Sequence, residues 1–184
     1  VVRVKLFRFG IHAGSAFGLL EPGQGVMCDL TSFDRGRPNL DRADPAAFRE
    51  AGVDDRVTFE VATAKEFTGR DYDLICFFDC LHDMGDPVGG AAHVRSALAP
   101  DGTWLLVEPH AKDDVKDNLN PLGRLFYSVS TLVCTQASLA QEVGLALGAQ
   151  AGEKRLRDVV TKAGFKRFRL ATETPFNLVF EVRP

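Results

Sequence analysis

A single histidine among acidic residues marks the segment of this chain where chemistry is easiest to place. His82 lies in the run YDLICFFDCLHDMGDP, between Asp79 and Asp83, and Asp86 follows shortly after. A neutral imidazole accepts a proton near neutral pH, and a neighbouring carboxylate polarises it and stabilises the cation that results. The residue types therefore predict a general base at His82. The alternative is a histidine that caps the following helix or satisfies a loop carbonyl.

The elements around His82 give it a position. Residues 72–78 are almost continuously apolar, which is typical of a strand buried on both faces in a parallel sheet. Pro87 suits the first turn of a helix that runs to about Leu98, and Asp83 has the alternative role of capping that helix. In open α/β sheets, ligands bind just beyond the C-terminal ends of the strands. We therefore expect residues 79–86 to form a functional turn.

The remaining sequence alternates between strand-like and helix-like segments. Strands are predicted at residues 2–9, 26–33, 56–61, 72–78, 103–107, 165–171 and 176–182, and helices at residues 38–50, 87–98, 119–133, 139–147 and 153–163. This alternation predicts an α/β fold with a doubly wound, parallel, seven-stranded sheet. The last two strands are joined by a short turn, so we expect them to be antiparallel.

Composition and charge limit the class of protein. The 184 residues, 45% of them hydrophobic, suffice for one domain with a real core. A net charge of −3 gives no basic surplus for a nucleic-acid surface, and the sequence contains neither a signal peptide nor a membrane-spanning apolar run. The four cysteines lack zinc spacing and are expected to be buried, reduced thiols. We therefore expect a cytoplasmic protein with neither nucleic acid nor membrane as a partner.

A metal site is not predicted either. His82 and Asp83 are adjacent in the sequence, so we expect their side chains to diverge. His110 follows a different predicted strand, and the chain contains no H-x-E or HExxH spacing.

Several motifs resemble those of class I S-adenosylmethionine-dependent methyltransferases. Leu98-Ala99-Pro100-Asp101-Gly102-Thr103 is similar to the L-x-P-G/D-G element that precedes the fifth strand of that family. From about Ala51 onwards, the phrases FDCLHDMGDP, LAPDGTW-LLVEP, DNLNP-GR-FY and QEVGLALGAQAG resemble bacterial methyltransferases with an N-terminal winged-helix domain. The resemblance implies a Rossmann-like catalytic domain over residues 1–184 without the winged-helix part. Residues 110–150 would be an insertion or lid over the acceptor pocket.

The resemblance also implies S-adenosylmethionine as the cofactor and assigns residues to it. These are Gly10, His12 and Gly14 for the methionine part, Asp34 for the ribose hydroxyls, Thr63, Ala64 and Lys65 for the adenine, and Asp79 where the methionine part and the acceptor meet. A carboxylate at the ribose position can accept hydrogen bonds from both hydroxyls.

Leu81-His82-Asp83 is similar to the L-H-D-W signature of small-molecule O-methyltransferases, in which the histidine is the general base. Glu108 ends a predicted strand where relatives use a glutamate to orient that histidine. The resemblance therefore implies methyl transfer to a small-molecule acceptor at oxygen, with His82 as the base and Asp83 or Glu108 as its aid. A homodimer is a further expectation. His110 and Tyr127 either line the acceptor pocket or belong to plain loop and core.

The first quarter of the chain departs from the family pattern. Arg8 stands where the family has an acidic residue, and His12 stands where it has the middle glycine of the cofactor loop. This departure predicts reduced or lost cofactor affinity. A locally altered sequence, such as a reading-frame slip before Ala51, would also explain the atypical first quarter. The alternative function is a degenerate domain that acts as a binding or regulatory module. A dinucleotide-dependent oxidoreductase would need an intact G-x-G-x-x-G, which is absent.

Overall fold

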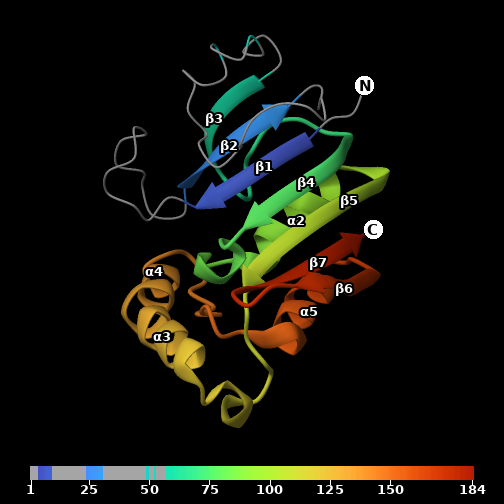
Figure 1. The fold of residues 1–184 in the computed structure, drawn as a ribbon. Helices are drawn as coiled ribbons and strands as arrows, with labels where there is room; N and C mark the ends of the chain where they lie inside the picture. The colour runs from blue at the N-terminus through green and yellow to red at the C-terminus, as the bar shows by residue number, and fades with distance from the viewer. Residues whose placement is uncertain (1–3, 10–23, 31–48, 50–51, 53–56) are drawn as a thin grey trace.

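The computed structural model describes residues 4–9, 24–30, 49, 52 and 57–184. Its strands are β1 (Val4–Phe9), β2 (Gln24–Leu30), β3 (Val57–Thr63), β4 (Tyr72–Phe78), β5 (Leu98–Pro109), β6 (Arg167–Glu173) and β7 (Asn177–Arg183). In this part of the chain the strands pair into one sheet, in the order β3-β2-β1-β4-β5-β7-β6 (Figure 1). The predicted mixed α/β class is confirmed.

The strand directions correct one prediction. β1, β4 and β5 run parallel, as expected, but β2 is antiparallel to both β1 and β3. Gly25 pairs with Phe9 and Leu30 pairs with Val4, so β2 returns directly alongside the strand that precedes it. An antiparallel return needs no crossover helix, whereas a parallel one must carry the chain back across the whole sheet first. The expectation that the first five strands are all parallel is therefore wrong for β2.

The C-terminal hairpin agrees with its prediction. β6 and β7 are antiparallel to each other, and β7 is antiparallel to β5. The Thr174 hydroxyl oxygen accepts hydrogen bonds from the backbone N–H groups of Phe176 and Asn177, which closes the short connection. Such a connection leaves no room for a crossover, so the two strands can only be antiparallel.

Two helices pack on one side of the sheet. α2 (Pro87–Ala97) and α5 (Gly152–Lys162) contact each other behind β4, β5 and β7 in Figure 1. The fully buried Trp104 lies beneath them, with its ring 5.1 Å from that of Phe77 and 5.4 Å from that of Phe165. Of the helix-like residues 38–50, only residue 49 is among the described residues, so double winding of the sheet stays a prediction.

The segment after β5 lies at the carboxyl ends of β4 and β5 (Figure 1). It contains the short helix η3 (Val115–Asn118), α3 (Pro121–Val129), the π-helical η4 (Ser130–Cys134) and α4 (Thr135–Leu139). The predicted helix over residues 139–147 is wrong. Val143 and Ala146 have φ values of 72° and 52°, which a helix does not allow. This stretch instead makes hydrogen bonds to the turn after β4.

Two expectations from composition can be compared with the described part of the chain. Cys76, Cys80 and Cys134 are free and buried, as predicted. No helix in that part combines the length and the apolar composition that crossing a bilayer requires.

Candidate active site

A histidine–glutamate pair lies at the centre of the candidate site. His82 is on the short helix η2 (Leu81–Asp83) directly after β4, and Glu108 is near the end of the neighbouring strand β5. His82 Nδ1 lies 2.6 Å from Glu108 Oε2, and the Leu81 N–H donates to Glu108 Oε1 at 2.9 Å. Both carboxylate oxygens are therefore held, and the pair is almost completely buried. The parallel pairing of β4 with β5 brings the two residues together across 26 positions of sequence.

Two further groups face the other nitrogen of His82. Nε2 lies 3.3 Å from Asp83 Oδ1, and Cys134 of η4 interacts with both side chains. Burial lowers the pKa of His82, but Glu108, Cys134 and Asp83 outweigh it and hold that pKa well above the usual value. Burial raises the pKa of Asp83, and the neighbouring His82 offsets part of this effect. The adjacent side chains of His82 and Asp83 therefore converge, which corrects the prediction that they diverge.

Residues 138–148 hold the turn that carries His82, and we call this segment the strap. The Ser138 hydroxyl donates to the Met84 carbonyl at 2.7 Å, and the Gln141 amide bonds both the Asp83 carbonyl and the Gly85 N–H. Leu145 N–H donates to the Gly85 carbonyl, and Gly148 N–H donates to the His82 carbonyl. The strap thus satisfies backbone groups at each of residues 82–85.

The packing between the strap and the turn is close. A Cβ placed on Gly85 would lie 2.5 Å from the Glu142 carbonyl oxygen and 2.5 Å from Gln141 Cβ. Backbone on one side leaves no room for a larger residue, so glycine is required there.

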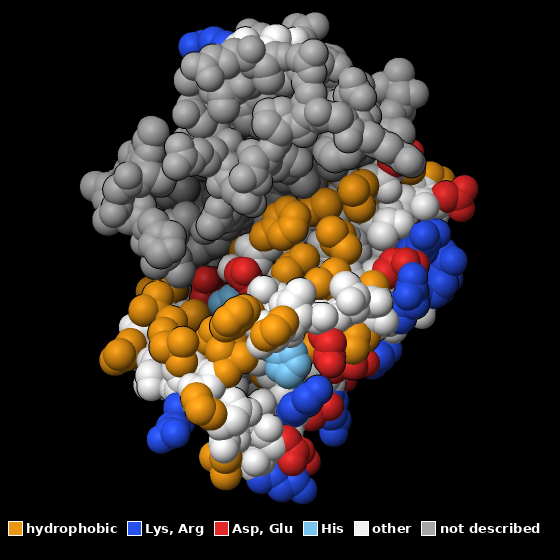
Figure 2. Space-filling model, viewed as in Figure 1, with side chains coloured by type: hydrophobic (Ala, Val, Ile, Leu, Met, Phe, Trp, Pro, Cys, Tyr) orange, Lys and Arg blue, Asp and Glu red, His pale blue; other side chains and the backbone are white. Residues whose placement is uncertain are grey.

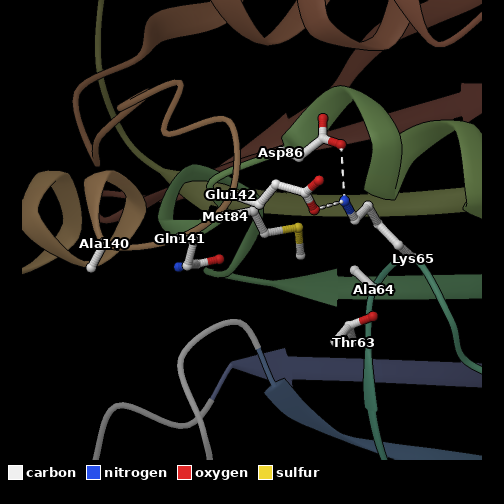
Figure 3. A pocket seen from close by; sticks show the side chains of 8 residues that line it. All are labelled: Thr63, Ala64, Lys65, Met84, Asp86, Ala140, Gln141 and Glu142. Atoms are coloured by element: carbon white, nitrogen blue, oxygen red, sulfur yellow. Dashed lines mark hydrogen bonds and ion pairs between the residues drawn. The ribbon is translucent and has the colours of Figure 1, made fainter.

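A cavity of about 320 Å³ opens between the end of β3, the turn and the strap (Figure 3). Its walls come from segments far apart in the sequence: Thr63, Ala64, Lys65, Met84, Asp86, Ala140, Gln141 and Glu142. The Lys65 side chain extends into the cavity, and its Nζ lies 2.8 Å from the Glu142 carboxylate and 3.3 Å from that of Asp86. The carboxylate of Glu142 raises the pKa of Lys65. The cavity therefore combines apolar side chains, such as those of Ala64 and Met84, with the ion pairs that Lys65 makes.

The other predicted acids have local roles in the described structure. The side chain of Asp86, rather than that of Asp83, caps α2 by accepting from the Gly89 N–H at 2.8 Å. Asp79 directly follows β4 with a φ of 46°, and its Oδ1 accepts a hydrogen bond from the Asn177 side chain at 2.8 Å. His110 faces Glu173 at 3.6 Å on the β6 side of the sheet. Asp79 and His110 do not line the cavity.

The remaining cofactor predictions concern residues that the structure does not describe. Gly10, His12, Gly14 and Asp34 lie outside the described residues. The prediction for Asp34 depended on a parallel second strand that ends at the edge of the sheet where His82 lies. β2 runs the other way, and its last residue, Leu30, pairs with the first residues of β1 and β3 at the opposite edge.

Several site residues were not singled out in the sequence. Cys134, Ser138, Gln141 and Glu142 reach the turn from the segment after β5. The available signal was the prediction that residues 110–150 cover the strand ends. That prediction identified the segment but not the individual side chains. Their contacts with the turn depend on the non-helical path of the strap.

Comparison with known proteins places this geometry in a known fold. The sequence matches no family model and no curated protein. Three similar solved structures are the mitomycin 7-O-methyltransferase MmcR, PigF with SAH, and human N-acetylserotonin methyltransferase in complex with SAM. Their sequence identities to this chain are 20%, 16% and 20%, and their TM-scores are 0.53, 0.55 and 0.50, in that order. The matches cover 74%, 76% and 67% of this chain and 37%, 39% and 32% of those chains. The chain thus shares the fold of these solved structures and spans about two-fifths or less of their length.

Proposed function

We propose that this chain is the catalytic domain of an S-adenosylmethionine-dependent methyltransferase that methylates a small molecule at oxygen, with His82 as the general base. The observation that supports it most is the 2.6 Å contact between His82 Nδ1 and Glu108 at the carboxyl ends of β4 and β5. That edge of an open α/β sheet is where ligands bind. The methyltransferases among the similar structures do not favour the alternative of a non-catalytic module.

The cavity fits the adenosine end of the cofactor. Its volume lies in the range of about 300–1,000 Å³ that is usual for small-molecule sites. Thr63, Ala64 and Lys65 would hold the adenine, since Ala64 and Met84 offer apolar surface and Thr63 and Lys65 offer polar groups. The assignments of Asp79, Gly10, His12, Gly14 and Asp34 to the cofactor stay predictions. When bound, S-adenosylmethionine supplies a methyl group activated by the sulfonium.

His82 would accept the proton of the acceptor hydroxyl at Nε2, because Glu108 occupies Nδ1. A carboxylate on Nδ1 fixes the ring and stabilises the imidazolium that forms, and a positioned base contributes about 10²–10⁴-fold to the rate. His82 is 4% exposed, with Asp83 and Cys134 on the Nε2 side. The acceptor can therefore reach Nε2 only if the segment that carries Cys134 moves. That requirement supports the prediction that residues 110–150 form a lid.

Calorimetric titration with S-adenosylhomocysteine tests the proposal. We expect stoichiometric binding, and in His82→Ala we expect unchanged affinity together with a loss of at least about 100-fold in methyl transfer to a panel of hydroxylated acceptors. His93→Gln is the matched control, because His93 lies on α2 and bonds the Phe67 carbonyl instead of the site. No heat and no thermal shift at millimolar ligand would overturn the proposal in favour of the non-catalytic module.

The homodimer is also a proposal. Hydrophobic side chains gather over the region of α3 and α4 in Figure 2. Leu125 and Val129 of α3 and Leu132 of η4 are exposed. Contiguous exposed apolar surface is typical of interaction sites. Sedimentation equilibrium of the chain, compared with that of Leu132→Glu, tests whether this surface joins two copies.

A further inference from the structure

Three potential metal ligands converge beside the cavity. One ring nitrogen of His82, one carboxylate oxygen of Asp83 and the Sγ of Cys134 all lie within 4.8 Å of one another, and all three residues are buried. His82 Nε2 and Asp83 Oδ1 are 3.3 Å apart. Two ligands of a tetrahedral zinc ion, at about 2.0–2.2 Å from the metal, are separated by about 3.3–3.6 Å. The spacing of the nitrogen and the oxygen is thus that of two ligands on one ion.

One of these ligand atoms, Asp83 Oδ1, accepts no hydrogen bond in the described part of the chain, although His82 Nε2 and Cys134 lie beside the Asp83 side chain. Asp83 is 3% exposed. Buried side-chain oxygens are nearly always satisfied, and an exception calls for an explanation such as an ion. The orphaned oxygen is aimed at His82 Nε2 and not at solvent. This observation is independent of the clustering of the three residue types.

Glu108 supplies the support that histidine ligands of metals require. A metal-bound histidine usually donates its other N–H to a carboxylate, which fixes the tautomer and orients the ring. Glu108 Oε2 lies 2.6 Å from His82 Nδ1, and Glu108 Oε1 is fixed by the Leu81 N–H. With one proton held on Nδ1 by Glu108, Nε2 offers its lone pair to a metal ion once its own proton is displaced, and Asp83 Oδ1 lies 3.3 Å from it.

We propose that His82 Nε2, Asp83 Oδ1 and Cys134 Sγ bind one divalent metal ion of the zinc class. A nitrogen, an oxygen and a thiolate suit Zn²⁺ better than Mg²⁺ or Ca²⁺, which prefer oxygen ligands alone. The ion would displace the Cys134 thiol proton, and any proton on Nε2, to solvent. A water molecule would complete the tetrahedron.

The consequence for activity rests on the proposed function. His82 Nε2 cannot coordinate an ion and accept a proton from the acceptor at the same time. Metal binding would therefore inhibit methyl transfer, and a chelator would restore it. The metal site itself stands on the geometry of the three ligands and does not depend on the chain being an enzyme.

Cobalt(II) titration of the chelator-treated chain tests the metal site directly. We expect one equivalent of Co²⁺ to produce the visible bands of a tetrahedral ion and a near-ultraviolet thiolate-to-metal band, both abolished by Zn²⁺. Cys134→Ser should lose the thiolate band, and Asp83→Asn should weaken binding at least about tenfold. Glu108→Gln should weaken it about 10–100-fold. Cys76→Ala, which changes a buried thiol of β4 outside the cluster, should leave the spectrum unchanged.

Two results would overturn the metal site. One is a spectrum of Co²⁺ without a thiolate band, and the other is an equal thiolate band in Cys134→Ser with its fold verified by circular dichroism. Failure of this inference is distinguishable from failure of the proposed function. S-adenosylhomocysteine binding without a cobalt signal removes the metal site alone. A cobalt signal without binding of S-adenosylhomocysteine removes the proposed function alone.

Discussion

At the scale of single residues, the electrostatics of His82 set the pH at which the site can work. The net effect of burial and of the neighbouring Glu108, Cys134 and Asp83 is a pKa well above the usual value for histidine. The imidazole therefore keeps its proton to higher pH than an ordinary histidine does. A protonated imidazole cannot accept the proton of an acceptor hydroxyl, so the fraction of active enzyme should rise as the pH rises through that pKa.

Glu108→Gln tests this dependence. The wild-type kcat should increase with pH above neutrality, and the variant should reach its plateau at lower pH, because loss of the carboxylate lowers the pKa of His82. The plateau itself should be lower, since a weaker base transfers the proton less well. The pH profile of kcat measures both effects. Identical profiles for the variant and the wild type would show that Glu108 does not act through His82.

Part of this residue-level arrangement could be predicted from the sequence. His82 and Glu108 follow consecutive predicted parallel strands, and parallel strands that pair side by side must bring their carboxyl ends together. The convergence of His82 with Asp83 could not be predicted, because it depends on the short helix η2 after β4. Cys134 could not be predicted either, because its position depends on how η4 packs over that helix.

At the scale of elements, the strap determines the shape of the turn. Its bonds to residues 82–85 come from one short stretch without helical structure. Opening of the strap should therefore expose these bonds together, as one cooperative unit. The lid movement that the acceptor requires would begin with this unit.

Gln141→Ala tests the role of the strap. The substitution removes two hydrogen bonds to the turn, and at about 0.5–1.5 kcal/mol each it should destabilise the chain by about 1–3 kcal/mol in urea unfolding. Amide exchange at Gly85, Leu145 and Gly148 should accelerate together. Gln136→Ala on the exposed face of α4 is the matched control and should change neither quantity. Faster exchange at Gly85 alone would contradict a cooperative strap.

The elements themselves differ in how well the sequence predicts them. β4 and α2 have clear signals, since an apolar run predicts β4 and Pro87 marks the start of α2. The strap has helix-forming residues such as Leu145 and Ala146 but does not form a helix. Tertiary hydrogen bonds to the turn override that local preference. The direction of β2 was equally unavailable, because residues 26–33 lack the continuous apolar run that is typical of a buried parallel strand.

At the scale of the whole molecule, the buried site couples the stability of the fold to pH. The pKa of His82 is higher in the folded chain than the usual value of about 6.5 for an unfolded one. Its proton therefore stabilises the fold fully below about pH 6.5, and this contribution is lost as the pH rises through the folded pKa. The groups that face His82 are Glu108 from β5, Asp83 from η2 and Cys134 from η4. All three reach it from elements whose packing requires the folded chain.

The free energy of unfolding should consequently fall between pH 6.5 and 8, by at most about 1.4 kcal/mol per pH unit for one proton. The buried thiol of Cys76 does not contribute in this window. Burial raises the pKa of Cys76 to about 12, and an unfolded thiol ionises only near about pH 8.5, so both states stay protonated below that pH. Urea unfolding at several pH values measures the slope. It should disappear in His82→Gln and persist in His93→Gln, because only His82 lies against these acids; an equal slope in His82→Gln would show that the proton binds elsewhere in the fold.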